Sequence, residues 1–456
     1  MRTFYSAMWW LALPLVLGRL WLRGRKEPGY RAHWGERLGC YGGAGAGTGA
    51  ARVAVTGTAA SAGEAAAASR AAGADMPTIW LHAVSVGETR AAEPLVDALL
   101  AAYPQHRIVL THMTPTGRAT GAALFGRHGA RLVQSYLPYD TATMVRRFLR
   151  HFAPRICILM ETEVWPNLIA ECGRAGVPVV LANARLSERS LRKAGRFGRL
   201  LLDAARGITL VAAQTEADAA RVATLGAPRV EVTGSIKFDV VVPAAALATG
   251  AALRAHIGGR PVLLCASTRE GEEALILDAF QQAREALPAD VLLLIVPRHP
   301  QRFDEVEKLV AERGLALERR STLALDGAAL PARVAVLLGD SMGEMFAYYA
   351  ACDCAFVGGS LLPLGGQNLI EPAALGKPVL IGPHTFNFAV VTEDALAAGG
   401  ALRVADAAEL MAATARLLGD AAARADMGRR ALAFANQHRG ATARTLALLQ
   451  TLLPSG

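Results

Sequence analysis

Short apolar runs alternate with longer amphipathic stretches from Pro77 onward. Runs rich in Val, Ile and Leu are typical of strands buried in a parallel sheet, and the amphipathic stretches between them are typical of helices that cover such a sheet. In the first half, the pattern predicts strands over 79–86, 107–114, 131–138, 155–163, 178–184, 208–214 and 230–235, and helices such as 89–102, 165–173 and 215–226. This alternation predicts right-handed βαβ units and a parallel sheet.

The pattern breaks over residues 240–258 and then resumes. In the second half, it predicts strands over 262–267, 291–296, 334–339, 354–358 and 378–381, and helices over 270–287, 302–313, 342–352 and 369–375. We therefore expect an α/β protein with two doubly wound, Rossmann-like domains: residues 77–240, then a linker over 241–259, then residues 260–456 with terminal helices. Such domains bind ligands at the carboxyl ends of their strands, so we expect a site in a cleft between them.

The composition agrees with a large folded protein. Hydrophobic residues make up 52% of the 456 residues and charged residues 19%, which excludes a chain that is disordered throughout. The six cysteines are sparse and lie mostly in apolar runs, such as Cys157 and Cys265, so we expect buried free thiols rather than a disulfide scaffold. Cys352 and Cys354 lack a second cluster at zinc spacing, so an ordinary core position is favoured for them.

The excess positive charge is concentrated at the N-terminus. The chain carries 48 Lys and Arg against 39 Asp and Glu, a net charge of +9. Residues 1–40 carry seven cations against Glu27 and Glu36, a net charge of +5 out of the +9, and they form a basic segment around an apolar run. The cations of this segment are Arg2, Arg19, Arg23, Arg25, Lys26, Arg31 and Arg37.

Residues 3–18 contain no charge, and the apolar character continues to Leu22. This length is marginal for a bilayer span, and the cations follow the run, unlike those of a signal peptide. We expect residues 1–40 to be a membrane anchor whose tryptophans and arginines suit a lipid surface, with the rest of the chain in the cytoplasm. The alternative is a core helix of the first domain. Residues 41–76 are rich in Ala and Gly, and we expect a flexible insertion there.

Charged side chains follow several predicted strands of the first half. Glu88 ends the segment HAVSVGE at a helix start, where the helix dipole favours its ionised form and where it can act as a general base. The alternative is a first-turn residue that only complements that dipole. Glu161 and Glu163 lie at the end of the fourth predicted strand and point the same way unless the strand has already turned. A carboxylate pair there is costly without a partner, so a role in the site is favoured over capping. Lys237 follows the seventh strand, where a lone lysine is usually solvated.

The second half repeats this arrangement. Arg298 follows its most apolar strand and is placed for a phosphate or carboxylate. Residues 339–344 (GDSMGE) run from a strand to a helix start, with backbone N–H groups available to an anion. Glycine pairs at 358–359 and 365–366 let the backbone approach a ligand closely. Each of these four features alone is compatible with an ordinary turn. Four of them at strand ends in one domain favour a ligand site.

Neither a dinucleotide fingerprint nor a Walker P-loop is present in the sequence. The segment GGQNLIEP at 365–372 instead indicates recognition of a nucleotide sugar. Its glutamate would hold ribose hydroxyls, and the glycine loops would hold phosphate.

With these residues assembled, the chain resembles the 3-deoxy-D-manno-octulosonic acid (Kdo) transferases of lipopolysaccharide synthesis, which are GT-B glycosyltransferases. The resemblance covers essentially the whole chain except residues 43–76. It is carried by short motifs in order at 23–26, 34–37, 82–88, 114–117, 136–140, 160–167, 182–187, 297–300, 357–360 and 382–388.

The resemblance implies transfer of Kdo from CMP-Kdo to the lipid A precursor lipid IVA, with release of CMP and inversion at the anomeric carbon, at the cytoplasmic face of a bacterial inner membrane. It implies that Glu88 is the general base and that Glu161 and Lys237 support the transition state. It also implies no metal, no cofactor and no nucleic-acid partner. The CMP contacts that it implies are Pro297, Arg298, Met342, Gly343, Glu344, Asn368, Leu369, Ile370 and Glu371.

Gln367 and Pro372 depart from the family, which often has His and Ala there, so the nucleotide loop can be held differently. Two other interpretations stay open. A transferase or epimerase that uses another sugar nucleotide would share the second-half motifs but would not need the membrane segment or HAVSVGE, and assays with CMP-Kdo against UDP-sugars separate the two. A non-catalytic, membrane-tethered binder of sugar nucleotides is disfavoured by the intact Glu88.

Overall fold

The computed structural model describes residues 1–25, 27–41 and 76–454, so almost all of the insertion expected over 41–76 lies outside the described residues, as does Lys26. The chain forms two compact units, each built on its own parallel sheet. Unit 1 comprises Met1–Asp239 and Gly440–Gly456, and unit 2 comprises Val240–Arg439.

Unit 1 contains a seven-stranded sheet in the order β3-β2-β1-β4-β5-β6-β7, and all its neighbouring strands are parallel. The strands are β1 Thr78–His82, β2 Arg107–His112, β3 Leu132–Tyr136, β4 Pro154–Met160, β5 Val179–Ala184, β6 Leu210–Ala213 and β7 Val230–Val232. The helices are α1 Arg2–Arg23, η1 Pro28–Arg31, α2 Trp34–Arg37, α4 Val86–Ala91, α5 Glu93–Ala102, α6 Pro115–Phe125, η2 Gly126–Arg131, α7 Ala142–Phe152, α8 Pro166–Arg174, α9 Glu188–Arg206, α10 Glu216–Ala223, η3 Ile236–Phe238 and α19 Ala441–Gln450. All seven strands predicted for the first half are present.

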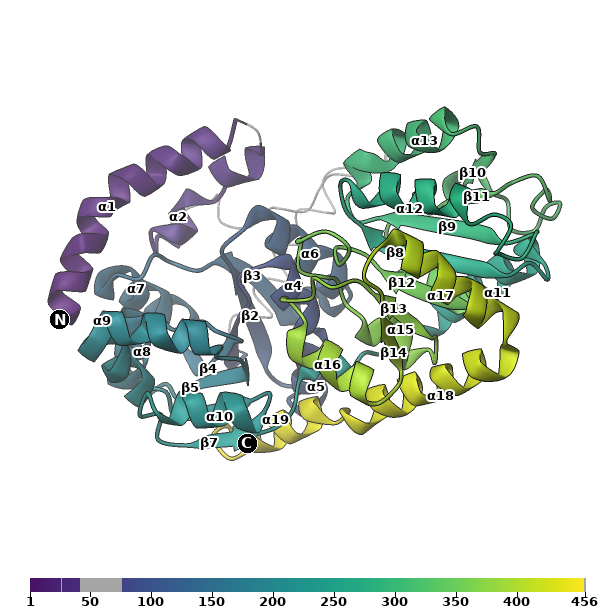
Figure 1. Ribbon diagram of the computed structural model, residues 1–456. Coiled ribbons are helices and arrows are strands. Elements are labelled where there is room, and N and C mark those ends of the chain that lie inside the picture. Colours follow the sequence, from purple (N-terminus) through teal and green to yellow (C-terminus); the bar gives the residue numbers. More distant parts are fainter. Residues whose placement is uncertain (26, 42–75, 455–456) are drawn as a thin grey trace. The chain divides into compact units, whose positions relative to one another are not determined.

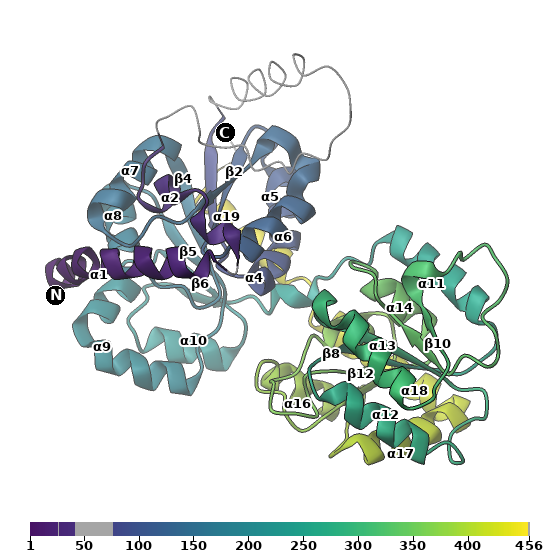
Figure 2. The ribbon, with the colours of Figure 1, turned by 90° about the horizontal axis from the view of Figure 1, so that it is seen from above.

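Successive residues of each strand in unit 1 point to opposite faces of the sheet. Ile79 and Leu81 pack in the apolar cluster formed with α5 and α19, whereas Trp80 packs in the one formed with α7 and α8. Figures 1 and 2 show α5 and α6 on one side of the sheet and α7 and α8 on the other. Because both faces are covered, the strands read as continuous apolar runs rather than as an alternation.

The order of strands in unit 1 reverses direction between β1 and β4, which are hydrogen-bonded neighbours. In open α/β sheets, ligands bind outside the carboxyl ends of the strands at such a switch point. The loop after β1 leads to Glu88, and the loop after β4 begins at Glu161. The fold thus brings two of the candidate segments together.

Unit 2 also contains a seven-stranded parallel sheet, in the order β10-β11-β9-β8-β12-β13-β14. Its strands are β8 Val262–Thr268, β9 Leu292–Pro297, β10 Leu317–Arg319, β11 Val336–Leu338, β12 Cys354–Val357, β13 Val379–Ile381 and β14 Ala401–Arg403. Its helices are α11 Ala244–Ile257, α12 Glu272–Gln282, η4 Pro300–Arg302, α13 Phe303–Glu312, η5 Arg320–Thr322, α14 Met345–Ala351, α15 Ile370–Ala374, α16 Ala389–Ala397, α17 Ala407–Gly419 and α18 Ala421–Gln437. Helices α12, α13 and α17 pack on one face of this sheet, and α11 and α14 pack on the other.

The structure corrects the predicted boundaries in several places. The expected linker over 241–259 contains helix α11, whose Leu253 and Ile257 are buried in the core of unit 2. The last helix, α19, belongs to unit 1, where the Tyr103 hydroxyl donates to the Leu453 carbonyl oxygen at 2.6 Å. The strands β10 and β14 were not predicted, because each has only three residues with charged side chains among them and gives no apolar run. The helix expected over 89–102 is divided into α4 and α5, and Pro94, which lacks an N–H, lies in the first turn of α5.

The six cysteines are free thiols. Five of them are buried, which confirms the prediction, and Cys40 is exposed.

Helix α1 has two different apolar faces. Trp9, Leu13 and Leu17 pack toward Tyr139 and Met144 of unit 1. The opposite face carries exposed apolar side chains at helical spacing, namely Phe4, Met8, Leu11, Leu15 and Leu22. No helix within the described part of the chain has the length and hydropathy needed to cross a bilayer.

Candidate active site

The local fold of residues 83–89 fixes the position of Glu88. Ser85 caps α4, and its hydroxyl accepts from the Glu88 N–H at 3.4 Å. The Glu88 side chain turns back, and its Oε2 accepts from the Val84 N–H at 2.7 Å. This arrangement differs from a capping box only in that the carboxylate binds the N–H of the residue before the cap, and it holds the carboxylate back toward the end of β1 rather than extended into solvent.

The environment of Glu88 tunes it for proton transfer. The pKa of its carboxyl is raised to about 7; burial is the largest cause and Glu163 and Glu161 add to it, whereas the Val84 N–H and Lys237 act in the opposite direction. A general base works best when its pKa lies near the working pH. Glu88 is therefore poised between its two protonation states at neutral pH, which a carboxylate that only complements a helix dipole would not be.

Glu161 and Lys237 form an ion pair, with 2.7 Å between Nζ and Oε1. Strand β4 ends at Met160, and Glu161 has a left-handed backbone conformation with a φ of 59°, so the chain has already turned and the alternation of a strand no longer sets where Glu161 and Glu163 point. Burial, and the neighbouring Glu161, raise the pKa of the Glu163 carboxyl. Lys237 is thus paired, which corrects the prediction that it is solvated.

Asn183 is a functional candidate that the sequence reasoning did not single out. It is fully buried in β5, has a φ of 54°, and accepts the Ile236 N–H on its Oδ1 at 3.1 Å. This bond holds the turn η3 that carries Lys237. Its complete burial, which appears only once the fold is known, is the feature that marks it as a candidate.

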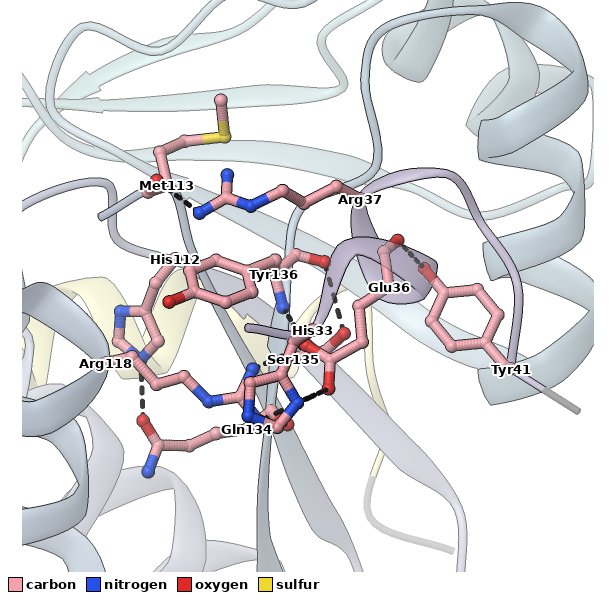
Figure 3. Close-up of polar contacts among 10 residues, drawn as sticks. All are labelled: His33, Glu36, Arg37, Tyr41, His112, Met113, Arg118, Gln134, Ser135 and Tyr136. Atoms are coloured by element: carbon pink, nitrogen blue, oxygen red, sulfur yellow. Dashed lines mark hydrogen bonds and ion pairs between the residues drawn. The ribbon is translucent and has the colours of Figure 1, made fainter. Parts of the chain in front are cut away.

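The N-terminal segment packs against the sheet of unit 1 at the ends of β2 and β3. Figure 3 shows Glu36 at the centre of a polar cluster, where its carboxylate accepts from Arg118 at 2.5 Å and from the Tyr136 N–H at 2.8 Å. The buried Arg37 guanidinium lies 3.7 Å from the centroid of the Tyr136 ring and donates to the Met113 carbonyl oxygen at 3.1 Å. The motif at 34–37 therefore anchors the basic segment to the ends of β2 and β3.

In unit 2, the residues expected to contact CMP lie at the end of β9, in the loops after β9, β11 and β12, and in the first turn of α15. Arg298 is half-buried, and its N–H donates to the Thr268 carbonyl oxygen at 2.9 Å. Glu344 accepts from Arg320 at 2.9 Å and from the Ser341 hydroxyl at 2.5 Å. The partners of Glu344 lie within unit 2, so the structure gives it a role in shaping this loop.

The segment 368–371 is organised around Asn368. Its Oδ1 accepts from the Ile370 N–H at 3.0 Å, and its Nδ2 donates to Glu371 Oε1 at 3.1 Å. Leu369 is fully buried, and Met342 is exposed. Asn368 therefore fixes both the start of α15 and the direction of the Glu371 carboxylate.

Glu272 was not predicted as a candidate, yet it organises the loops of unit 2. Its carboxylate is fully buried at the start of α12, and its Oε1 accepts from the Ser360 and Leu361 N–H groups, both at 2.9 Å. Its Oε2 accepts from Gly359 N–H at 2.6 Å and from Arg269 N–H at 2.9 Å. The backbone donors of the first glycine loop are thus already satisfied by a carboxylate, and the hypothesis that this loop holds a phosphate is wrong for these N–H groups.

Comparisons with known proteins complete the description. Residues 32–240 match the family model of the 3-deoxy-D-manno-octulosonic-acid transferases (kdotransferases). A 3-deoxy-D-manno-octulosonic acid transferase from Bordetella pertussis is 50% identical over 381 residues, which are 82% of this chain and 87% of the relative. One from Haemophilus influenzae is 36% identical over 456 residues, 99% of each chain. Among solved structures, a glycosyltransferase from Rickettsia africae has a TM-score of 0.55 at 12% identity and covers 84% of this chain and 100% of its own.

The two parallel seven-stranded sheets with their helices, together with this structural likeness, define the GT-B fold. The chain belongs to the Kdo transferase family. The fold class and the resemblance predicted from the sequence are both confirmed.

Proposed function

We propose that this enzyme transfers Kdo from CMP-Kdo to lipid IVA, releases CMP and inverts the configuration at the anomeric carbon. The observation that carries the proposal is Glu88, whose carboxylate is oriented by the Val84 N–H at 2.7 Å and whose pKa is raised to about 7. Membership of the Kdo transferase family supports the choice of sugar.

In the proposed mechanism, the Glu88 carboxylate accepts the proton of the acceptor hydroxyl. The acceptor oxygen forms the new bond to the anomeric carbon, the bond from that carbon to the phosphate oxygen breaks, and its electron pair leaves with CMP. Lys237 and Glu161, paired at 2.7 Å, place a positive and a negative charge beside Glu88. Their proposed role is to support the charge that develops as the sugar passes through an oxocarbenium-like state.

Unit 2 is proposed to bind the donor through Arg298, Glu344 and the segment 368–371, with no metal or cofactor. Burial lowers the pKa of His299, and the cations Arg269, Arg298 and Arg302 lower it further, so the loop after β9 lies in a positive field. Such a field favours the phosphate of CMP-Kdo. Because Glu272 occupies the N–H groups of 359–361, we assign the phosphate to this positive field.

The enzyme is also proposed to rest on the cytoplasmic face of the inner membrane through the outer face of α1. Leu11 and Leu15 are 79% and 78% exposed on this face, although the opposite face of the same helix packs on unit 1. Arg19 and Arg23 are exposed at its C-terminal end, where they suit anionic lipid headgroups. The helix would therefore lie in the interface with its outer apolar face among the acyl chains.

The decisive test of the chemistry is Glu88→Gln, which keeps the shape of the side chain and removes the base. We expect transfer from CMP-Kdo to lipid IVA to fall by about 10²- to 10⁴-fold, the range usual for a lost general base, as measured by mass spectrometry of the lipid product. Glu93→Gln, in the first turn of α5, is the matched control and should keep its activity. Full transfer by Glu88→Gln would refute the role of Glu88 as the base. Equal use of UDP-sugars by the unaltered enzyme would refute the choice of donor.

The test of membrane binding is the pair Leu11→Gln and Leu15→Gln. We expect the double variant to lose most of its co-sedimentation with vesicles that contain anionic lipid, because it removes two exposed leucines from the outer face. Ala12→Gln, at a half-buried position of the same helix, is the matched control. Unchanged sedimentation of the double variant would contradict this role for α1.

A further inference from the structure

We infer that His112 is a positioning residue that holds the loop bearing Glu88, and that it acts as a neutral hydrogen-bond donor. This inference rests on the proposed role of Glu88 as the base. His112 is the last residue of β2, the strand beside β1, and its side chain is fully buried. Neither the sequence motifs nor the resemblance assigns it a function.

The ring of His112 contacts the chain both before and after Glu88. Its Nδ1 lies 3.1 Å from the Ala83 carbonyl oxygen and 3.4 Å from the Thr89 hydroxyl. Ala83 precedes Val84, whose N–H binds the Glu88 carboxylate at 2.7 Å, and Thr89 directly follows Glu88. One imidazole therefore ties the two ends of the segment that shapes the base.

The surroundings select the tautomer of His112. A carbonyl oxygen only accepts, so Nδ1 carries the proton and donates it to Ala83. The other ring nitrogen, Nε2, then accepts. It lies 2.9 Å from the amide of Gln134, which satisfies all its partners when its nitrogen donates to His112 and to the Arg118 carbonyl oxygen and its oxygen accepts from Ala122. Figure 3 shows the ring directed at the end of the Gln134 side chain.

Helix α6 leaves no spare room around this pair. A Cβ on Gly121 would lie 2.9 Å from His112 Nε2 and 2.6 Å from the Gln134 amide. The ring is thus confined between α6 and the loop that carries the base. Because the ring cannot move and has a single tautomer, its hydrogen bond to Ala83 holds the loop that carries Glu88 at a fixed distance from β2.

Glu88 and His112 have different electrostatic surroundings. Glu88 is faced by Glu161, Glu163 and Lys237. The pKa of His112 is lowered to about 4; burial is the largest cause and the nearby Arg118 adds to it, whereas the hydrogen bonds with Gln134 and Ala83 act in the opposite direction. His112 is therefore uncharged at neutral pH and acts on Glu88 through the position of the backbone rather than through a charge.

The experiment compares His112→Ala with His112→Asn, whose amide nitrogen can take the place of Nδ1. We expect His112→Ala to lower kcat about 10- to 100-fold, because misplacement of a reacting group by about 1 Å costs this much, with the KM for CMP-Kdo changed less than about twofold. His112→Asn should recover kcat to within about threefold of the unaltered enzyme, at a melting temperature similar to that of His112→Ala. His106→Ala, at a half-buried position outside this network, should leave kcat unchanged.

Two results would overturn the inference. One is full kcat in His112→Ala, and the other is an equal loss in the Ala and Asn variants that follows their melting temperatures. Combination with Glu88→Gln separates the inference from the proposed function. If Glu88→Gln is inactive and His112→Ala is fully active, only the positioning role fails, whereas full activity of Glu88→Gln overturns both. If His112 acts through Glu88, adding His112→Ala to Glu88→Gln should not lower the residual rate further.

Discussion

Replacement of Glu272 by Gln is the sharpest test of how unit 2 is built. The buried carboxylate accepts four backbone N–H groups, two on each oxygen, from Arg269, Gly359, Ser360 and Leu361. A glutamine has the same shape, but its NH₂ group replaces one oxygen. Whichever way the amide turns, two of the four N–H groups then face another donor.

The magnitude follows from these bonds. A hydrogen bond to a charged group contributes about 1.5 to 3 kcal/mol, so the loss of two costs about 3 to 6 kcal/mol of the free energy of unfolding of unit 2. For a domain of this size, each kcal/mol shifts the melting temperature by about 2 to 4 °C, which gives a decrease of about 6 to 24 °C.

The assay is calorimetry of the full-length protein, with CMP-Kdo binding measured in parallel. Because the N–H groups lie in the loops after β8 and β12, donor affinity should fall together with the stability of unit 2. Glu285→Gln, at an exposed position, is the matched control and should change neither quantity. A decrease below about 2 °C for Glu272→Gln would refute this account of the loop, since a single lost bond already predicts that much.

Three further predictions concern the base and the N-terminal segment. With the pKa of Glu88 near 7, kcat/KM should rise with pH through about 7, because the base must be ionised; a flat profile from pH 5 to 8 would contradict this. Lys237→Met should move this acid limb to higher pH and Glu163→Gln should move it to lower pH, because the lysine lowers and the carboxylate raises the pKa of Glu88; shifts in the same direction would refute the electrostatic argument. Glu36→Gln removes the charge that pairs with Arg118, so it should destabilise unit 1 by about 3 to 5 kcal/mol in calorimetry, whereas Glu27→Gln should have no effect.

The sequence predicts most strands of the two sheets because a strand that is buried on both faces appears in the sequence as an apolar run. All seven strands of unit 1 and five of the seven in unit 2 correspond to predicted strands, and most of them are buried. The strands β10 and β14 give no such signal, since each has only three residues and one or two of these are charged. Helix α11 was mistaken for a linker because its alanines carry little of the contrast that marks an amphipathic helix.

The candidate site was only partly predictable for a different reason. Glu88 and Glu161 stand out in the sequence because a charge follows an apolar strand. His112, Asn183 and Glu272 act through hydrogen bonds to backbone groups that are 29, 53 and 87 residues away, and no local pattern encodes such pairs. Their common signature is a polar side chain that is fully buried, a property that appears only once the fold is known.

The different pKa values of Glu88 and His112 explain how one loop can be both held firmly and kept reactive. A protonated histidine beside the base would lower the pKa of Glu88 and weaken it as a proton acceptor. Burial keeps His112 neutral until the pH falls to about 4, far below the pKa of about 7 at Glu88. His112 should therefore add no proton of its own to the acid limb of the pH profile, because it becomes charged only after the base is already protonated.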